Sequence, residues 1–265
     1  MARDDQPELT ILDGFARLGV NLNGLIVPGN LIQQTLARYA TNLIVNNQGD
    51  ERMKLFIPGS ATAVRYRGAE LILVTQHQLK DIDQSQVAML TDSGSHIVTT
   101  SGRRGYNLHP DTDAYDIVAF NFTAPCEEFP ELKTRFFNLT AVPAHFVPDS
   151  ILAMLLAGFP SEAQDYDLYE NNRLGFRRLQ VVCLPHPDQP SDDALLRVKP
   201  IRSLTVDPNG MSGGAAFVVQ YADGEPRAYF AGLIIRGGRE DFYILKSGVV
   251  VAFLDSIFPW DRSVV

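Results

Sequence analysis

Short apolar runs separated by turn residues are the feature that most limits what this chain can fold into. Residues 43–45 run into the turn cluster 47–50, and residues 61–66 are followed by Arg67-Gly68. Further on, the segment 223–226 separates two more apolar runs. Gly, Pro, Asn and Asp favour turns through their backbone angles or local side-chain hydrogen bonds. Many short strands at this spacing predict an all-β barrel or sandwich.

Only two stretches have the pattern of a helix. Residues 31–40 follow Asn30, a residue type that can cap a helix N-terminus, and offer apolar side chains for burial. Residues 249–258 at the other end of the sequence predict a terminal helix. We therefore expect a β protein with one short helix near each end.

Charge and hydropathy exclude some functional classes. Of the 265 residues, 31 are acidic and 23 are Lys or Arg, which gives a net charge of −8. This balance disfavours a nucleic-acid partner, which would call for a basic surface. The longest apolar runs, such as residues 151–159, are too short to span a bilayer, and the first residues lack the apolar segment of a signal peptide. We expect neither a nucleic-acid nor a membrane partner.

The stretch 209–216 reads Asn-Gly-Met-Ser-Gly-Gly-Ala-Ala and contains G-x-S-G-G. A serine hydroxyl is a poor nucleophile and must be exposed on a tight turn beside a base. Glycines permit such a turn and let a substrate backbone approach, and the amides of the turn can stabilise an oxyanion. The apolar run that follows predicts a buried strand that holds the turn. Taken alone, the motif also fits a plain glycine-rich hairpin.

Two upstream segments favour the catalytic interpretation. The apolar run 71–74 leads to His77, and Asp116 directly precedes the apolar run 117–120. The order His77, Asp116, Ser212 is the order of the triad in chymotrypsin-type enzymes. Asp111 and Asp113 lie in the same loop as Asp116, but they are further from the strand that would fix their geometry. The other histidines do not end an apolar strand at this spacing: His96, His109, His145 and His186.

These motifs together resemble the trypsin-like (chymotrypsin-fold) serine peptidases, nearest in style to bacterial stand-alone forms. The resemblance covers about residues 42–258. It rests on six landmarks: Gly-Ser-Ala-Thr-Ala-Val at 59–64, Val-Thr-Gln-His at 74–77, Asp-Ile-Val at 116–118, Ala-Gly-Phe-Pro at 157–160, Gly-Met-Ser-Gly-Gly at 210–214 and Ala-Gly-Leu-Ile-Ile-Arg-Gly at 231–237.

The resemblance implies two antiparallel six-stranded β-barrels with the site in the cleft between them. We place an extension with a short helix at residues 1–41. The first barrel, carrying His77 and Asp116, then spans residues 42–140, and the second barrel with Ser212 and the C-terminal helix spans residues 141–265.

The family pattern also implies a role for each motif residue. His77 would be the general base toward Ser212, and Asp116 would hold the His77 tautomer and stabilise the imidazolium. Ser212 would be the nucleophile. The amides of Gly210 and Ser212 would form the oxyanion hole. We expect no metal ion and no cofactor.

Residues 235–237 would border the primary substrate pocket by the same alignment. Ile235 stands where relatives usually have a serine, and Arg236 and Gly237 follow it. The preferred substrate side chain stays open. Asp207 lies near the register of the pocket floor, but the sequence Asp-Pro-Asn-Gly also makes it the first residue of a type I turn.

Cys126 and Cys183 are the two cysteines of the chain. We expect small buried thiols, with a single disulfide as the alternative. Secreted relatives of this fold commonly carry several disulfides, so the pattern favours a reducing cytoplasm.

The residue before the predicted nucleophile departs from the pattern of the digestive relatives. Those enzymes have an aspartate there, which pairs with an N-terminal amine freed by cleavage. Here the residue is Met211, which carries no charge. We therefore expect the oxyanion loop to be ordered by packing of Met211 or by a partner, without such a cleavage.

The leading hypothesis is a cytoplasmic serine endopeptidase acting on protein or peptide substrates, with regulation by a partner protein left open. The alternative is a catalytically silent or partner-gated binding module, since fold does not dictate function. A lipase or esterase is disfavoured because its serine comes first in chain order.

Overall fold

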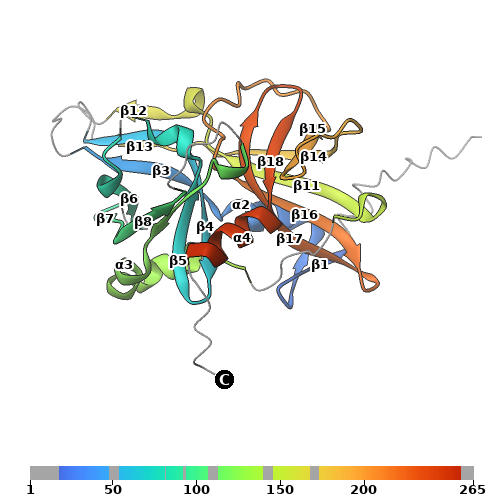
Figure 1. Cartoon of the computed structure of the whole chain (residues 1–265), viewed down its shortest axis with the longest axis horizontal. Coiled ribbons are helices and arrows are strands. Elements are labelled where there is room, and N and C mark those ends of the chain that lie inside the picture. The colour runs from blue at the N-terminus through green and yellow to red at the C-terminus, as the bar shows by residue number, and fades with distance from the viewer. Residues whose placement is uncertain are drawn as a thin grey trace, which may run out of the picture.

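The computed structural model describes residues 18–47, 54–80, 82–91, 94–106, 113–139, 146–167 and 173–257. Two eight-stranded sheets form the body of the described part of the chain, and short helices join or cover them (Figure 1). The expectation of an all-β, two-barrel protein is confirmed.

One sheet closes into a six-stranded barrel. Its strands follow one another in the order β16-β11-β14-β15-β18-β17, and β17 pairs again with β16 to close the ring. Strands β1 and β2 extend this sheet beyond β17, so part of the N-terminal extension packs onto the second barrel. The bounds are β1 Gly19–Leu22, β2 Leu25–Pro28, β11 Ile151–Gly158, β14 Leu179–Pro185, β15 Leu195–Pro200, β16 Ala215–Ala222, β17 Glu225–Gly237 and β18 Phe242–Lys246.

The other sheet curls into a half-barrel. Its order is β7-β6-β3-β4-β5-β9-β8, with β10 parallel to β4; a separate hairpin pairs β12 with β13. The bounds are β3 Ala40–Asn46, β4 Leu55–Tyr66, β5 Ala69–Val74, β6 Val87–Leu90, β7 Ile97–Thr99, β8 Gly102–Gly105, β9 Val118–Asn121, β10 Phe137–Asn138, β12 Asp165–Asp167 and β13 Arg173–Gly175. The boundary that we predicted near residue 140 falls in residues 140–145, outside the described residues, and stays a prediction.

The N-terminal helix exists, but its limits differ from the prediction. Helix α2 spans Gly29–Ala37, so Asn30 lies inside it and no side chain caps its N-terminus. Ala40 instead begins β3, where it pairs with Thr62. Burial explains the shorter helix. Ile32 and Leu36, one turn apart, face the core, and the chain then forms strand β3.

The C-terminal helix α4 spans Ser247–Ile257, two residues earlier than predicted at its start, and the predicted end at Phe258 lies outside the described residues. It buries Val250, Phe253 and Leu254. It lies across the junction of the two sheets (Figure 1), and Tyr66 from the end of β4 donates a hydrogen bond to Asp255 of this helix.

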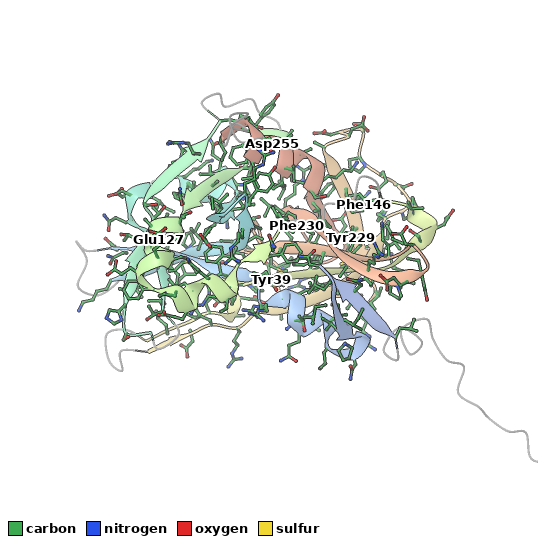
Figure 2. The ribbon with its side chains drawn as sticks, turned by 90° about the horizontal axis from the view of Figure 1, so that it is seen from below. Tyr39, Glu127, Phe146, Tyr229, Phe230 and Asp255 are labelled. Carbon is green, nitrogen blue, oxygen red and sulfur yellow. The ribbon has the colours of Figure 1, made fainter. Side chains whose placement is uncertain are left out.

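An aromatic cluster joins the two sheets. Phe137 of the half-barrel packs edge-on against Phe217 of the closed barrel, with ring centroids 5.1 Å apart. Phe230 and Tyr39 complete the group, and both lie near the middle of the molecule in Figure 2. Such pairs add about 0.5–1.5 kcal/mol beyond the burial of their area. The two halves therefore share a hydrophobic cluster at their junction, beside a separate core within each half.

The prediction of buried thiols is confirmed. Cys126 and Cys183 are both free and buried. Burial raises the pKa of Cys126 to about 11 and raises the pKa of Cys183 further. Within the described ranges, no helix has the length and apolar character needed to cross a membrane.

Candidate functional site

His77 lies where a central strand of the half-barrel ends. Strand β5 stops at Val74, and Thr75 begins the short 3-10 helix η1 (Gln76–Leu79). Thr75 and Gln78 form a capping box, a local interaction that ends the strand and starts the helix. The His77 side chain is 46% exposed, so a substrate can reach it.

Asp116 meets His77 because their strands are neighbours. Asp116 stands between the short helix η3 (Asp113–Tyr115) and β9, and β9 pairs with β5 so that Val74 lies opposite Val118. The Asp116 Oδ2 atom is 2.6 Å from His77 Nδ1, and Oδ1 accepts the backbone N–H of His77 at 2.9 Å. This pairing orients the ring with its Nδ1 proton toward the carboxylate and leaves Nε2 as the basic atom.

Ser212 lies on a tight turn directly before β16. The N–H of Met211 donates to the carbonyl of Pro208 at 2.9 Å, and Gly210 and Gly213 have φ angles of +95° and +80°. These are left-handed conformations that residues with a Cβ rarely adopt. Met211 is buried in the core of the closed barrel, and the ordering of this loop by its packing or by a partner stays a prediction.

Three side chains of the half-barrel side hold this turn. Ser60 Oγ donates to the carbonyl of Gly210 at 2.7 Å, and Thr62 Oγ1 donates to the carbonyl of Gly213 at 2.8 Å. Gln78 Nε2 donates to the carbonyl of Ser212 at 2.7 Å. Our sequence analysis missed these residues. The capping-box pattern of Thr75 and Gln78 was visible in the sequence, but the cross-sheet contacts had no sequence signal.

The Ser212 hydroxyl forms a hydrogen bond with the backbone of β17. Its Oγ donates to the backbone carbonyl of Ile235 at 2.8 Å. His77 Nε2 instead lies 3.5 Å from Thr75 Oγ1, and across the described ranges no hydrogen bond joins Ser212 to His77. The structure thus brings His77 and Asp116 together, whereas the Ser212 hydroxyl is paired with the Ile235 carbonyl.

The predicted oxyanion donors have no competing partner. Neither the Gly210 N–H nor the Ser212 N–H makes a hydrogen bond to another group within the part of the chain that the structure describes. The neighbouring amides are used: Gly213 N–H donates to the carbonyl of Ile234 at 2.7 Å. The N–H groups of Gly210 and Ser212 are therefore available to a ligand oxygen at this turn.

The three predicted substrate-side residues form the end of β17, beside Ser212. Ile235 is buried, whereas Arg236 is exposed, forms an ion pair with Asp113 and stacks 4.4 Å from the centre of the Tyr243 ring. At Gly237 an added Cβ would be 2.2 Å from a Phe242 ring atom. Asp113, a rival of Asp116 in the sequence, therefore pairs with Arg236. The other rival, Asp111, lies outside the described residues.

Asp207 behaves as the first residue of a turn. It is exposed, and its side chain accepts the N–H of Asn209 at 3.0 Å. This contact supports the turn interpretation rather than an acidic pocket floor.

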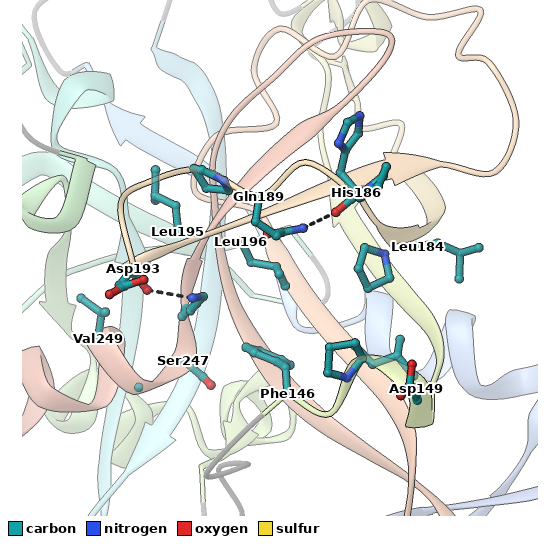
Figure 3. A pocket seen from close by; sticks show the side chains of 17 residues that line it. Phe146, Asp149, Leu184, His186, Gln189, Asp193, Leu195, Leu196, Ser247 and Val249 are labelled. Carbon is teal, nitrogen blue, oxygen red and sulfur yellow. Dashed lines mark hydrogen bonds between the residues drawn. The ribbon is translucent and has the colours of Figure 1, made fainter.

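A cavity of about 950 Å³ lies elsewhere on the closed barrel (Figure 3). Phe146, Leu184, Gln189 and the first residues of α4 line it, together with prolines of the 185–190 loop. None of the predicted site residues lines this cavity. Within the described ranges, no group of three His, Cys, Asp or Glu side chains could hold a metal ion.

Comparison with known proteins gives a fold relationship. No protein-family model matches the chain, and no curated protein matches it. Among solved structures, it is similar to human heparin binding protein, with a TM-score of 0.51 and 12% identity over 84% of this chain and 92% of that one. It is also similar to the scabies mite inactivated protease paralogue S-D1, with a TM-score of 0.50 and 10% identity over 84% of this chain and 93% of that one.

The fold is the chymotrypsin-like two-barrel fold. Both similar structures are chymotrypsin-fold homologues of serine proteases. At this identity the likeness concerns the fold, so the chemistry of this chain has to be argued from its own residues.

Proposed function

We propose that this protein is a serine endopeptidase that hydrolyses peptide bonds through His77, Asp116 and Ser212. The observation that carries the proposal is the double hydrogen bond between the Asp116 carboxylate and His77. The ring contact is the one by which a carboxylate holds the tautomer of a general base, and the backbone contact keeps the residue in place.

The proposed reaction begins with a change of the Ser212 rotamer. Its hydroxyl would leave the Ile235 carbonyl and donate to His77 Nε2, a side-chain rotation that is fast on the time scale of catalysis. The Ser212 oxygen would then attack the substrate carbonyl carbon as its proton passes to His77. The resulting oxyanion would accept hydrogen bonds from the amides of Gly210 and Ser212.

Collapse of that intermediate would break the peptide C–N bond. His77 would return its proton to the leaving amine and leave an acyl group on Ser212. A water molecule would then add to the acyl carbon as His77 takes its proton. The bond between the acyl carbon and the Ser212 oxygen would break as His77 passes that proton to Ser212, and the carboxylic acid would leave. This route uses side chains and backbone amides only. The substrate would be an extended protein or peptide segment beside residues 235–237.

Labelling with a fluorophosphonate probe tests the proposal without a known substrate. The Ser212 oxygen would form a bond to phosphorus as fluoride leaves, and intact mass would report one adduct. We expect wild type and the exposed-site control Ser203→Ala to be labelled, and Ser212→Ala and His77→Ala to stay unlabelled. An unlabelled wild type, or a labelled Ser212→Ala, would contradict the proposal.

A catalytically silent or partner-gated binding module is the second candidate. The hydrogen bond from Ser212 to Ile235, which occupies the hydroxyl, favours it. The names of the similar structures describe a heparin binding protein and an inactivated protease paralogue. For this candidate, partner binding in cells would be equal for wild type and Ser212→Ala. For a protease, the Ser212→Ala variant would retain partners that wild type cleaves.

We also propose that the protein works in a reducing compartment, the cytoplasm. The two buried free thiols support this. The kinship with bacterial stand-alone forms and regulation by a partner protein stay part of the proposal.

A further inference from the structure

We propose that Gln78 is the positioning residue that fixes the Ser212 turn relative to His77. We call the Gln78 side chain, with its contacts to Thr75, Ser60 and Ser212, the amide bridge. The part of this inference that concerns catalysis rests on the proposed function. The part that concerns the order of the turn does not.

The amide bridge spans three segments of the fold. Gln78 Nε2 donates to the carbonyl of Ser212 at 2.7 Å and to the carbonyl of Ser60 at 3.3 Å. Its Oε1 accepts the backbone N–H of Thr75 at 3.1 Å and the Thr75 hydroxyl at 2.8 Å. A side-chain amide offers two N–H donors and two lone pairs, so all of its hydrogen-bonding capacity is used. A carboxylate or a thioether of the same length could not make this set of contacts.

Two glycines keep the space that the amide occupies. A Cβ at Gly59 would lie 2.4 Å from Gln78 Nε2. A Cβ at Gly213 would lie 2.8 Å from Gln78 Oε1 and 2.3 Å from the carbonyl oxygen of Ser60. Both distances to the amide are below the closest approach that real Cβ atoms make. Gly59-Ser60 of β4 and Ser212-Gly213 of the turn before β16 therefore enclose this side chain.

The position of Gln78 directly after His77 in the chain links the two parts of the site. His77 and Gln78 are consecutive residues of η1, and each reaches a different part of the site: His77 binds Asp116, and Gln78 binds the backbone of Ser212. One short helix therefore sets the separation between the base and the residue that carries the nucleophile, although η1 follows a strand of the half-barrel and the Ser212 turn precedes a strand of the closed barrel. A misplacement of about 1 Å between reacting groups can cost about a hundredfold in rate.

The test compares Gln78→Met with Gln189→Met. Methionine keeps the length of the side chain and removes its donors and acceptor. Gln189 serves as a matched control because it takes no part in the amide bridge, and its amide also binds backbone carbonyls, including that of Arg197 of β15 at 3.0 Å. Gln78→Glu is the second variant, and it would place a carboxylate oxygen against two carbonyl oxygens. Each variant is measured as the full chain, first confirmed as folded.

Two readouts are needed. We expect Gln78→Met and Gln78→Glu to be labelled by the fluorophosphonate probe roughly a hundredfold more slowly than wild type, and Gln189→Met at the wild-type rate. With an activated ester substrate the loss should appear in kcat and not in KM. Amide hydrogen exchange in residues 209–214 should become faster in both Gln78 variants and stay unchanged in Gln189→Met.

The outcomes separate this inference from the proposed function. If wild type is labelled, the inference requires both slower labelling and faster exchange, and a wild-type value for either overturns it. If wild type is not labelled, the proposed function fails, and the exchange of residues 209–214 alone decides the role of Gln78. If Gln78→Met does not fold, Gln78→Glu is judged by the same two measurements.

Discussion

Both oxygens of the Asp116 carboxylate bind His77, one through the ring Nδ1 at 2.6 Å and one through the backbone N–H at 2.9 Å. The backbone contact fixes where the residue lies, and the ring contact fixes how the imidazole is turned. The two contacts act together, because the carboxylate cannot shift toward one without weakening the other.

This relationship predicts a large effect of Asp116→Asn. An amide can donate to Nδ1, which would favour the tautomer with its proton on Nε2, so that Nε2 could no longer accept the Ser212 proton in the proposed reaction. We expect the rate of fluorophosphonate labelling to fall about 10⁴-fold, the size of the effect in a well-studied triad. The labelling time course measures it, with Asp149→Asn, an exposed carboxyl away from the site, as control. A fall of less than tenfold would remove Asp116 from the mechanism.

The shared aromatic core predicts a strong effect on stability. Phe137 is buried and contacts Phe217 and Phe230 across the two sheets. We expect Phe137→Ala to lower the free energy of unfolding by about 3–5 kcal/mol, because it removes a large buried side chain and leaves a cavity. Urea unfolding measures the change. Phe176→Ala serves as control because Phe176 is exposed, and an equal loss in both variants would contradict the shared core.

The raised pKa of Tyr66 predicts a loss of stability at alkaline pH. Burial, followed by the hydrogen bond to Asp255, raises the pKa of Tyr66 to about 12 from the ordinary 10.0. Because the folded state favours the neutral phenol, Tyr66 contributes to the free energy of unfolding. That contribution is complete below pH 10 and is lost as the pH rises from 10 through about 12. We expect the stability difference between wild type and Tyr66→Phe to shrink over that range. Urea unfolding of both proteins at pH 8, 9, 10 and 11 checks this, and a constant difference would contradict it.

The burial of Cys126 and Cys183 predicts that neither thiol reacts in the folded protein. Both are fully buried, and burial raises the pKa of each thiol, so little reactive thiolate forms at neutral pH. We expect no reaction with a thiol reagent at pH 8 in the folded protein and two thiols per chain after denaturation. Rapid labelling of the native protein would show that at least one of these side chains is accessible.

The sequence by itself predicted the class of fold, which is confirmed, and the local backbone setting of the candidate site residues. The alternation of apolar runs and turn residues predicts strands because it is a local property of the backbone and its side chains. The positions of His77 at a strand end and of Ser212 in a glycine-rich turn follow from local patterns in the same way. The helix limits were less accurate. Ala40 was predicted to end the first helix, but it begins β3 and pairs with Thr62 of β4.

Only the tertiary structure decided how these pieces meet. The contacts of Ser60, Thr62 and Gln78 with the Ser212 turn join residues more than a hundred positions apart, and no local pattern encodes such pairs. The rotamer of Ser212 likewise depends on the Ile235 carbonyl, which another strand supplies. The physical reason is that a hydrogen bond between distant segments depends on the path of both backbones. That path is set by the packing of the whole core.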